Sequence, residues 1–226
     1  MEYRHELKFL VTDAQLETVR YRLKPLMRPD IHQKEGGYTI RSLYFDDFYD
    51  SCMRENEDGI DNRKKYRIRI YEGDDSVIRL EKKIKFRGMT KKVEADISRQ
   101  DCLIYLSGGV PVLQGQDPVL KKELYGEIRA RGMHPVTIVE YDRYAFVEPC
   151  GNVRITFDRN ISCYERTESF LDRKILRMPL LPAGWHVLEV KYDELLPEYI
   201  SDVLDLGSLQ RTAFSKYWYS RNYSGV

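Results

Sequence analysis

Charged side chains that recur at every second residue are the feature of this sequence most suited to chemistry. The order Glu-x-Lys occurs three times, at Glu6/Lys8, Glu81/Lys83 and Glu189/Lys191. Arg67 and Arg69 have the same spacing, as do the polar residues of the segment 154–158. Because residues two apart share one face of a β-strand, these charges lie on one face and the apolar residues between them on the other.

Such a face suits a polyanion if the strands close around it. Two like charges about 4 Å apart repel by on the order of 4 kcal/mol at an effective dielectric constant near 20, so a crowded basic face favours an anionic ligand. Arginine offers phosphate a planar fork, and lysine offers it a point charge. Carboxylates among them are hard ligands for Mg²⁺ or Mn²⁺. The chemistry indicated is phosphoryl transfer or cleavage on a multiply phosphorylated substrate.

The plainer interpretation is a sheet with one solvated face that carries cross-strand ion pairs, and for any single strand that interpretation is sufficient. The number of strands favours a closed arrangement instead, because eight strands are enough to close a barrel and turn the charged face inward to form a tunnel. Strand-like segments are expected at residues 3–10, 38–45, 65–71, 77–84, 91–97, 136–146, 153–158 and 186–192. The links at 72–75, 87–88 and 149–152 are short, which predicts hairpins and a mainly antiparallel sheet.

Helical patterns lie between and after these strands. Thr12 and Gln15 form a capping-box pattern, followed on one face by Leu16, Val19, Leu23 and Leu26. Ser98 with Asp101 predicts a short helix over 102–106, and further helices are expected at 117–132, 198–206 and 211–219. No Ser/Gly/Pro-rich linker divides the chain. The predicted fold class is α+β, with one domain over residues 1–226.

Composition excludes several classes of protein. The 226 residues include 37 Lys+Arg and 36 Asp+Glu, a net charge of +1, which disfavours binding of nucleic acid through bulk charge. No apolar run approaches the roughly 18 residues of a membrane helix, and the charged N-terminus does not read as a secretory signal. The four cysteines form no CxxC pair, so reduced cysteines in a cytoplasmic protein are expected.

Several short motifs then point to a family in combination. They are 4–9 (RHELKF), 43–46 (LYFD), 65–69 (KYRIR), 80–83 (LEKK), 140–143 (EYDR), 153–158 (VRITFD), 188–191 (LEVK) and 214–217 (FSKY). In this order the chain resembles a VTC domain, the polyphosphate polymerase branch of the triphosphate tunnel (CYTH-like) metalloenzymes. The resemblance implies an eight-stranded antiparallel tunnel barrel with helices packed outside. It also implies transfer of the γ-phosphate of ATP to a growing polyphosphate chain, with Mn²⁺ or Mg²⁺ as cofactor.

Site residues carry over from the resemblance motif by motif. The expected catalytic cations are Arg67, Arg69, Lys83, Arg143 and Lys191. The expected substrate-binding residues are Lys8, Tyr141, Arg154, Ser215 and Lys216, with Lys91 or Lys92 from the fifth strand. Glu189 matches the metal-binding glutamate, and Glu6 and Glu81 are further candidate ligands or else structural ion-pair partners. The wider superfamily begins its first motif with Glu where this chain has Arg4, which removes one candidate ligand.

Alternatives remain at this point. A tripolyphosphatase or nucleoside triphosphatase would use the same residues with water as acceptor, and a non-catalytic polyphosphate-binding module would use them without turnover. Glu140 and Asp142 are expected to face outward, and the basic run 63–65 reads as a solvated turn or as a contact for a product chain. The expected partners are ATP and inorganic polyphosphate or triphosphate, with no specific nucleic acid. A separate membrane protein could hold the chain at the inner face of the membrane; the oligomeric state is left open.

Overall fold

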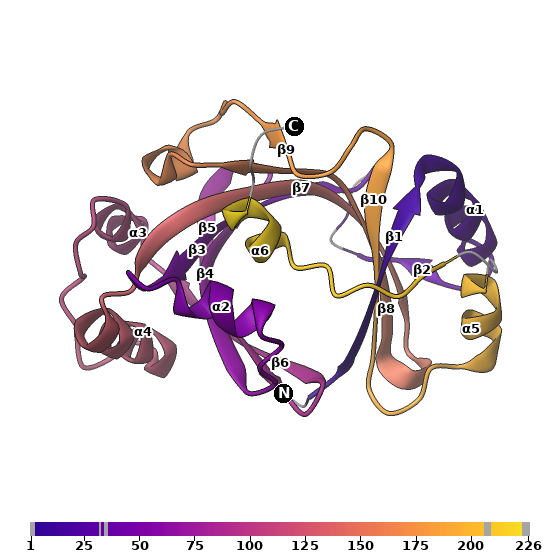
Figure 1. Ribbon diagram of the computed structural model, residues 1–226, viewed down its shortest axis with the longest axis horizontal. Helices are drawn as coiled ribbons and strands as arrows, with labels where there is room; N and C mark the ends of the chain where they lie inside the picture. Colours follow the sequence, from indigo (N-terminus) through magenta and orange to yellow (C-terminus); the bar gives the residue numbers. More distant parts are fainter. Residues whose placement is uncertain (1–2, 32, 34–35, 206–208, 223–226) are drawn as a thin grey trace.

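The computed structural model describes residues 3–31, 33, 36–205 and 209–222. Its framework is one strongly curved antiparallel sheet (Figure 1). The strands are β1 (His5–Thr12), β2 (Arg28–Pro29), β3 (Tyr38–Asp46), β4 (Arg63–Tyr71), β5 (Asp74–Phe86), β6 (Met89–Ile97), β7 (His134–Glu148), β8 (Val153–Tyr164), β9 (Met178–Pro179) and β10 (Trp185–Tyr192). The α-helices are α1 (Asp13–Leu23), α2 (Ser51–Glu57), α3 (Arg99–Leu106), α4 (Val119–Arg131), α5 (Glu198–Leu204) and α6 (Lys216–Arg221), with 3₁₀ turns at Cys150–Asn152 and Thr167–Leu171.

The main path of the sheet contains the eight predicted strands in the order β1-β10-β8-β7-β3-β4-β5-β6, and the two-residue strands β2 and β9 pair with β7 and β8. The first and last strands of this path meet at a single bridge, in which Arg4 and Thr90 exchange two backbone hydrogen bonds of 2.9 Å. Along the described residues no continuous ladder joins β1 to β6. The sheet therefore curves round on itself as predicted, but its closure depends on one pair of residues.

The apolar core lies on the outer face of the sheet. On one side α1 and α5 pack on β1, β8 and β10, and on the other α3 packs on β5 and β7 and α4 on β5 and β6 (Figure 1). Leu188 and Val190 of β10 and Ile68 and Ile70 of β4 are buried in these clusters. The predicted alternation is thus confirmed, since the apolar residues face the helices and leave the concave face polar.

Two helices differ from their sequence-based expectation. The capping box at Thr12 and Gln15 is present, but α1 ends at Leu23, and Leu26 is 38% exposed instead of on the buried face. Pro25 lacks the amide hydrogen that another turn needs. Only part of the expected helix at 211–219 forms, because residue 211 pairs with β1 at Phe9 and the amide of Thr212 donates to the carbonyl of Lys8.

Other boundaries moved by smaller amounts. The helix α2 was not predicted, and β5, β7 and β8 all extend beyond the expected ranges. The expected helix at 198–206 ends at Leu204, and residue 206 is outside the described residues. The four cysteines are free thiols, as expected. None of the helices described is both long and apolar enough to cross a bilayer.

Candidate functional site: a cationic cavity inside the curved sheet

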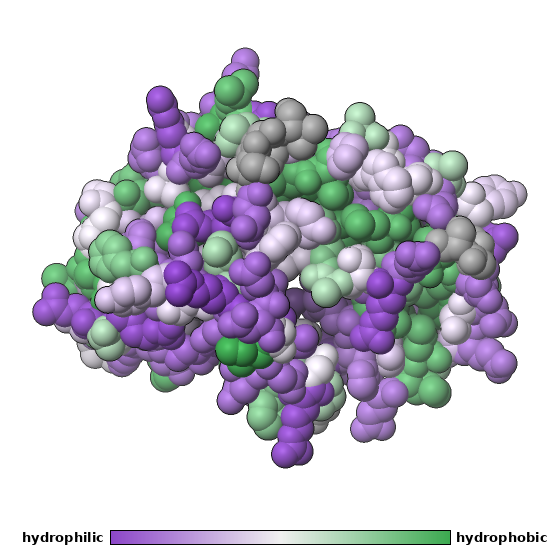
Figure 2. Space-filling view, viewed as in Figure 1, coloured by the Kyte–Doolittle hydropathy of each residue, from purple (hydrophilic) through white to green (hydrophobic). Residues whose placement is uncertain are grey.

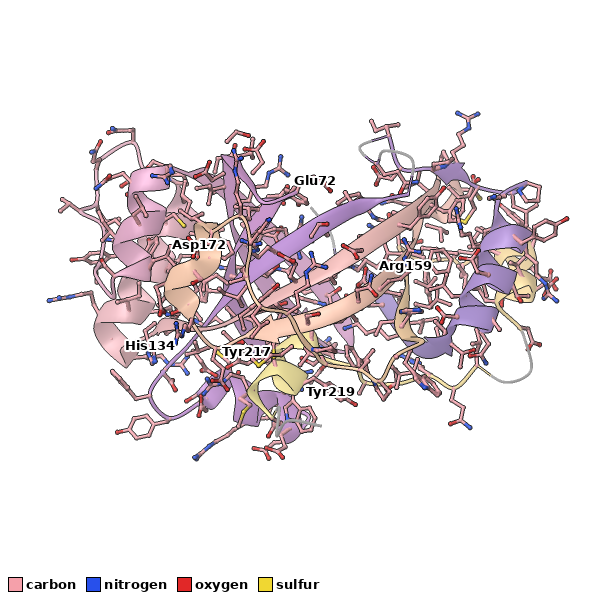
Figure 3. The ribbon with its side chains drawn as sticks, turned by 90° about the horizontal axis from the view of Figure 1, so that it is seen from above. Glu72, His134, Arg159, Asp172, Tyr217 and Tyr219 are labelled. Carbon is pink, nitrogen blue, oxygen red and sulfur yellow. The ribbon has the colours of Figure 1, made fainter. Side chains whose placement is uncertain are left out.

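The concave face of the sheet encloses a cavity of about 1480 Å³. Hydrophilic residues surround the depression near the centre of the face seen in Figure 2. Both Glu72 and Tyr217 line the cavity, and Figure 3 shows them on opposite sides of the molecule, Tyr217 on α6 and Glu72 at the β4–β5 turn. The cavity therefore extends across the sheet from one side of the molecule to the other.

Basic side chains outnumber acidic ones on the cavity wall. The basic residues are Arg4, Lys8, Arg63, Lys65, Arg67, Arg69, Arg79, Lys83, Lys85, Lys91, Lys92, Arg143, Arg154, Lys191, Arg211 and Lys216. The acidic residues are Glu6, Asp30, Glu72, Asp74, Glu94, Glu189 and Asp193. The near-neutral chain therefore concentrates positive charge inside the sheet, where an anion is only partly screened by water.

A first cluster joins β1, β5 and β10. The ammonium groups of Lys8 and Lys83 lie 3.1 and 2.8 Å from the carboxylate of Glu6, and that of Lys191 lies 2.8 Å from Glu189 and 4.0 Å from Glu6. Burial alone would raise the pKa of both carboxyl groups. The surrounding lysines lower the pKa of Glu6 to about 2 and hold that of Glu189 well below its usual range. Both glutamates are therefore anionic at neutral pH.

A second cluster is built around Glu81 of β5, whose side chain is buried. Arg67 donates from Nε at 2.7 Å to one carboxylate oxygen, and Arg69 donates from Nη1 at 3.2 Å to the other. Lys92 lies 3.6 Å away. Although burial opposes ionisation, the two guanidinium groups lower the pKa of Glu81. The carboxylate holds the two arginines in fixed positions side by side.

A third cluster lies on β7, β8 and α6. Asp158, which is fully buried, accepts two hydrogen bonds from Arg143, at 2.6 and 2.7 Å, and a third from Lys216 at 2.6 Å. The cationic groups of Arg143 and Lys216 lie 5.2 and 4.7 Å from the ring centroid of Tyr141. Burial would raise the pKa of Tyr141, but Arg143, Arg69 and Lys216 lower it. The phenol is thus held as a hydrogen-bonding group among cations.

The structure brings nearly all the predicted site residues together on the cavity wall, and Glu81 lies directly behind that wall. Lys92 pairs in register with Lys83 and so shares its inward face, whereas Lys91 contacts the ring of Tyr3 at the strand edge. Both lysines line the cavity, and the pairing with Lys83 places Lys92 next to the lysine cluster. Arg154 lies 2.9 Å from Asp30.

Other predicted positions also have clear surroundings. Ser215 caps α6, with its hydroxyl oxygen accepting from the amide of Trp218. Glu140 forms an ion pair with Arg41, and Asp142 accepts from Thr39. Neither acid lines the cavity, which confirms that both face away from it.

Two residues that shape the site were not predicted as site residues: Asp158, which is buried behind the wall, and Lys65, which lines the cavity. Asp158 was placed on the charged face, but its contact with Arg143 required the pairing of β7 with β8. Lys65 was read as part of a basic run that is either a solvated turn or a contact for a product chain, and it lines the cavity two residues before Arg67. The sequence signal for an inward-facing Lys65 was its spacing of two and four residues from Arg67 and Arg69.

The donor set fits a divalent metal at Glu6 and Glu189 better than at Glu81. Within the described residues no three His, Cys, Asp or Glu side chains gather as a ready-made metal site. Mg²⁺ and similar ions commonly take one or two carboxylates and complete their shell with water and substrate phosphates. Glu6 and Glu189 line the cavity, where lysines hold them, and could supply those carboxylates; Glu81 lies behind the wall with both oxygens engaged by arginine. The structure thus favours Glu81 as an ion-pair partner.

Two lysines give the cavity a pH dependence. Burial, reinforced by neighbouring cations, lowers the pKa of Lys65 to about 7, and burial lowers that of Lys83 to about 8 despite the attraction of Glu6. Raising the pH from 6 to 9 therefore removes positive charge from the free protein. A bound polyanion favours the protonated lysines and raises their pKa values, so we expect binding to take up protons near pH 8.5 and affinity to fall as pH rises.

Calorimetry of metal-free tripolyphosphate binding in two buffers with different ionisation enthalpies measures this uptake. We expect net uptake of somewhat less than one proton, because Lys83, which belongs to the central clusters, is mostly neutral in the free protein at that pH. Equal heats in the two buffers would contradict the pKa assignments.

A cationic cavity enclosed by a curved, eight-stranded antiparallel sheet, with helices packed on the outer face of the sheet, defines the triphosphate tunnel fold. The chain also matches the model of the VTC domain over residues 3–223, and it therefore belongs to the VTC domain family. Membership of this family implies a divalent metal cofactor.

Two solved structures show the same fold at low sequence identity. One is a candidate adenylyl cyclase from Hippeastrum, with 13% identity, a TM-score of 0.54, and 98% of this chain and 95% of that chain covered. The other, from Vibrio parahaemolyticus, is also described as a candidate adenylate cyclase, with 12% identity, a TM-score of 0.50, and coverage of 96% and 97%. No curated protein sequence matches the chain significantly. We refer to the cavity below as the tunnel.

Proposed function

We propose that the protein is an ATP-dependent polyphosphate polymerase, which transfers the γ-phosphate of ATP to inorganic polyphosphate inside the tunnel. The observation that carries the proposal is the excess of basic over acidic side chains on the tunnel wall. Buried carboxylates fix the arginines and lysines in place before any ligand binds. Such preorganised charge suits a reaction in which stabilising phosphate oxygens and aligning the reactants supply most of the catalysis.

The tunnel residues would divide the work by their geometry. Arg67 and Arg69, held by Glu81, present neighbouring guanidinium forks to the phosphate that is transferred. Lys8 of β1 and Lys191 of β10 supply point charges, as does Lys83 of β5, the strand that pairs with β4. A terminal oxygen of the acceptor chain would attack the γ-phosphorus, so no covalent protein nucleophile is required.

The remaining residues would bind and align the chain. Arg143 and Lys216, anchored on Asp158, hold phosphate oxygens beside Tyr141, whose hydroxyl accepts from Arg69 at 3.4 Å. Arg154 and Ser215 also line the tunnel. A divalent ion at Glu189 and Glu6 would offset negative charge on the phosphate oxygens; Mn²⁺ and Mg²⁺ both suit these ligands.

A triphosphate hydrolase is the second candidate. The Hippeastrum protein, which has the same fold, is described as having a dominant triphosphatase activity. In that case water would take the place of the acceptor chain, and the same cations would stabilise the transition state. A binding module without turnover would differ from both by forming no product with any divalent metal.

Incubation of the purified protein with ATP and Mn²⁺ or Mg²⁺ distinguishes these possibilities. We expect a polymer that is resolved by gel electrophoresis and destroyed by an exopolyphosphatase. Orthophosphate released without polymer would favour the hydrolase. Binding of polyphosphate without either product would favour the binding module.

We propose a cytoplasmic location on separate grounds. ATP as donor and four free cysteines both suit that compartment. Association with a separate membrane protein remains a prediction from the family resemblance.

A further inference from the structure

A row of cations on β4 and β5 extends the tunnel wall beyond the three clusters. Antiparallel pairing sets Lys65 opposite Lys83, and Arg63 opposite Lys85. All four side chains line the tunnel. Like charges directly opposite on a sheet destabilise it. Folding alone therefore does not favour this arrangement, and an anion that occupies the row would relieve the repulsion.

Lys65 is the residue of this row whose surroundings are most informative. Its ammonium donates to the side-chain oxygen of Asn56 at 3.0 Å and to the hydroxyl of Ser215 at 3.5 Å. It also lies 4.9 Å from the ring centroid of Tyr217. Over the residues that the structure describes, no carboxylate forms an ion pair with it. The lysines of the three clusters each have such a partner, so Lys65 differs from them and is positioned to take a negative charge from a ligand.

The outer part of the row is similar. Arg63 donates to the backbone carbonyl of Ile60, and no ion pair is found for Arg63 or Lys85 among the described residues. Glu55 and Asp61 are the acids that act on Arg63 electrostatically, but neither is within ion-pair distance of it. These acids soften the repulsion within the row without neutralising it.

We propose that Lys65, Lys85 and Arg63 bind the part of a polyphosphate chain that extends past the phosphates held in the central clusters. This inference rests on the proposed function and adds to it a preference for long chains over tripolyphosphate. Residues two apart on a strand are roughly 6.7 Å apart, so the row from Arg67 to Arg63 is about 13 Å long. That length accommodates additional phosphates beyond a bound triphosphate.

A single-stranded nucleic acid would fit this row less well. Sequence-tolerant binding of single strands combines a basic groove with aromatic rings on which the bases stack. The aromatic ring beside Lys65 is that of Tyr217, and one of its faces already meets the ammonium. Its hydroxyl donates to Asp46, which fixes the ring against the wall.

The adjacent lysine provides a matched control. Lys64 has the same side chain but points to the outer face, where it forms an ion pair with Glu127 of α4. We would titrate wild type, Lys65→Met, Lys65→Arg and Lys64→Met with tripolyphosphate and with long-chain polyphosphate. The loss of one charge-assisted contact predicts that Lys65→Met binds the long chain about 10-fold more weakly.

The same variant should bind tripolyphosphate within about twofold of wild type, because the central clusters are intact. Lys65→Arg should keep most of the affinity for the long chain, and Lys64→Met should bind both ligands as the wild type does. Equal long-chain affinity for the Lys65→Met and Lys64→Met variants would overturn the inference, as would a wild type with no preference for the long chain. An RNA oligonucleotide that displaces polyphosphate at equal charge would overturn it in favour of nucleic acid.

Failure of the proposed function would appear differently. If wild-type protein forms no polymer from ATP but long-chain binding still depends on Lys65, the row is confirmed and the polymerase proposal is wrong. If wild-type protein forms polymer from ATP but the Lys65→Met variant binds long chains as the wild type does, the polymerase proposal is supported and the inference about the row is wrong.

Discussion

The Glu189→Gln variant is expected to turn over ATP about 100- to 1000-fold more slowly than wild type, equivalent to about 3–4 kcal/mol of lost transition-state stabilisation. The expected loss is large because Glu189 is buried, lines the tunnel and, in the proposed function, holds the divalent ion. Glutamine keeps the size of the side chain but removes its charge. Steady-state kinetics with saturating Mn²⁺ would measure the effect.

The same substitution should have the opposite effect on anion binding without metal. Glu189 lies among Lys8, Lys83, Lys191 and Arg143, so its neutralisation raises the net positive charge of the tunnel. We therefore expect tripolyphosphate to bind at least as tightly to Glu189→Gln as to wild type in the presence of a chelator. Weaker binding together with slower turnover would indicate that Glu189 merely holds the lysines in place.

A matched control is available outside the tunnel. Glu123 of α4 also pairs with a lysine, Lys82, but on the outer face of the sheet. The Glu123→Gln variant should retain both turnover and binding.

The Arg67→Met variant is expected to reduce kcat/KM for ATP about 100-fold. The guanidinium of Arg67 donates from Nε to Glu81 and from Nη1 to the hydroxyl of Tyr44 at 3.1 Å. The side chain also lines the tunnel. A charge-assisted hydrogen bond to a charged group contributes about 1.5–3 kcal/mol, which corresponds to roughly 10- to 100-fold. We expect the upper end of this range because two arginines act side by side on the same phosphate.

Two further variants separate charge from geometry and from stability. Arg67→Lys keeps the charge but loses the fork, and its rate should lie between those of wild type and Arg67→Met. Glu81 keeps Arg69 and Lys92 as partners in either case, so thermal unfolding should show a folded protein. Arg99→Met removes an arginine that pairs with Asp75 on the exposed surface and should leave kcat/KM unchanged. Full activity of Arg67→Met in a folded protein would contradict the assignment.

Much of the fold follows from local periodicity. Alternation of charged and apolar residues placed the inward residues of β1, β4, β5 and β10 correctly, because the pleat of a strand fixes which face each side chain takes. The capping box of α1 was equally visible, since its two hydrogen bonds join residues three apart.

Features that depend on partners far away in the sequence were harder to predict. The segment at 211–215 has a helical pattern, yet it runs extended along β1, where Thr212 donates to the carbonyl of Lys8. The position of Lys92 opposite Lys83 depended on the register of β6 against β5. The sequence left open whether Lys65 lies in a solvated turn or contacts a product chain, because its burial comes from α2 and from Ser215 before α6, which the alternation within β4 does not report.

These contacts explain how a chain with a net charge of +1 can enclose a basic cavity. Outer acids such as Glu123 and Glu127 neutralise outward lysines on helix α4's side of the sheet. Inner acids such as Glu81 and Asp158 position cations but do not match their number. A chain that is almost neutral can therefore present a strongly basic interior.

The most direct test of a polyphosphate site in the tunnel is a crystal structure of the protein with tripolyphosphate and Mn²⁺. We expect the phosphates inside the tunnel, in contact with Arg67, Arg69 and Arg143, and the metal at Glu189. Phosphates bound only on the outer surface, with the tunnel arginines still paired to Glu81 and Asp158 alone, would contradict the proposed site.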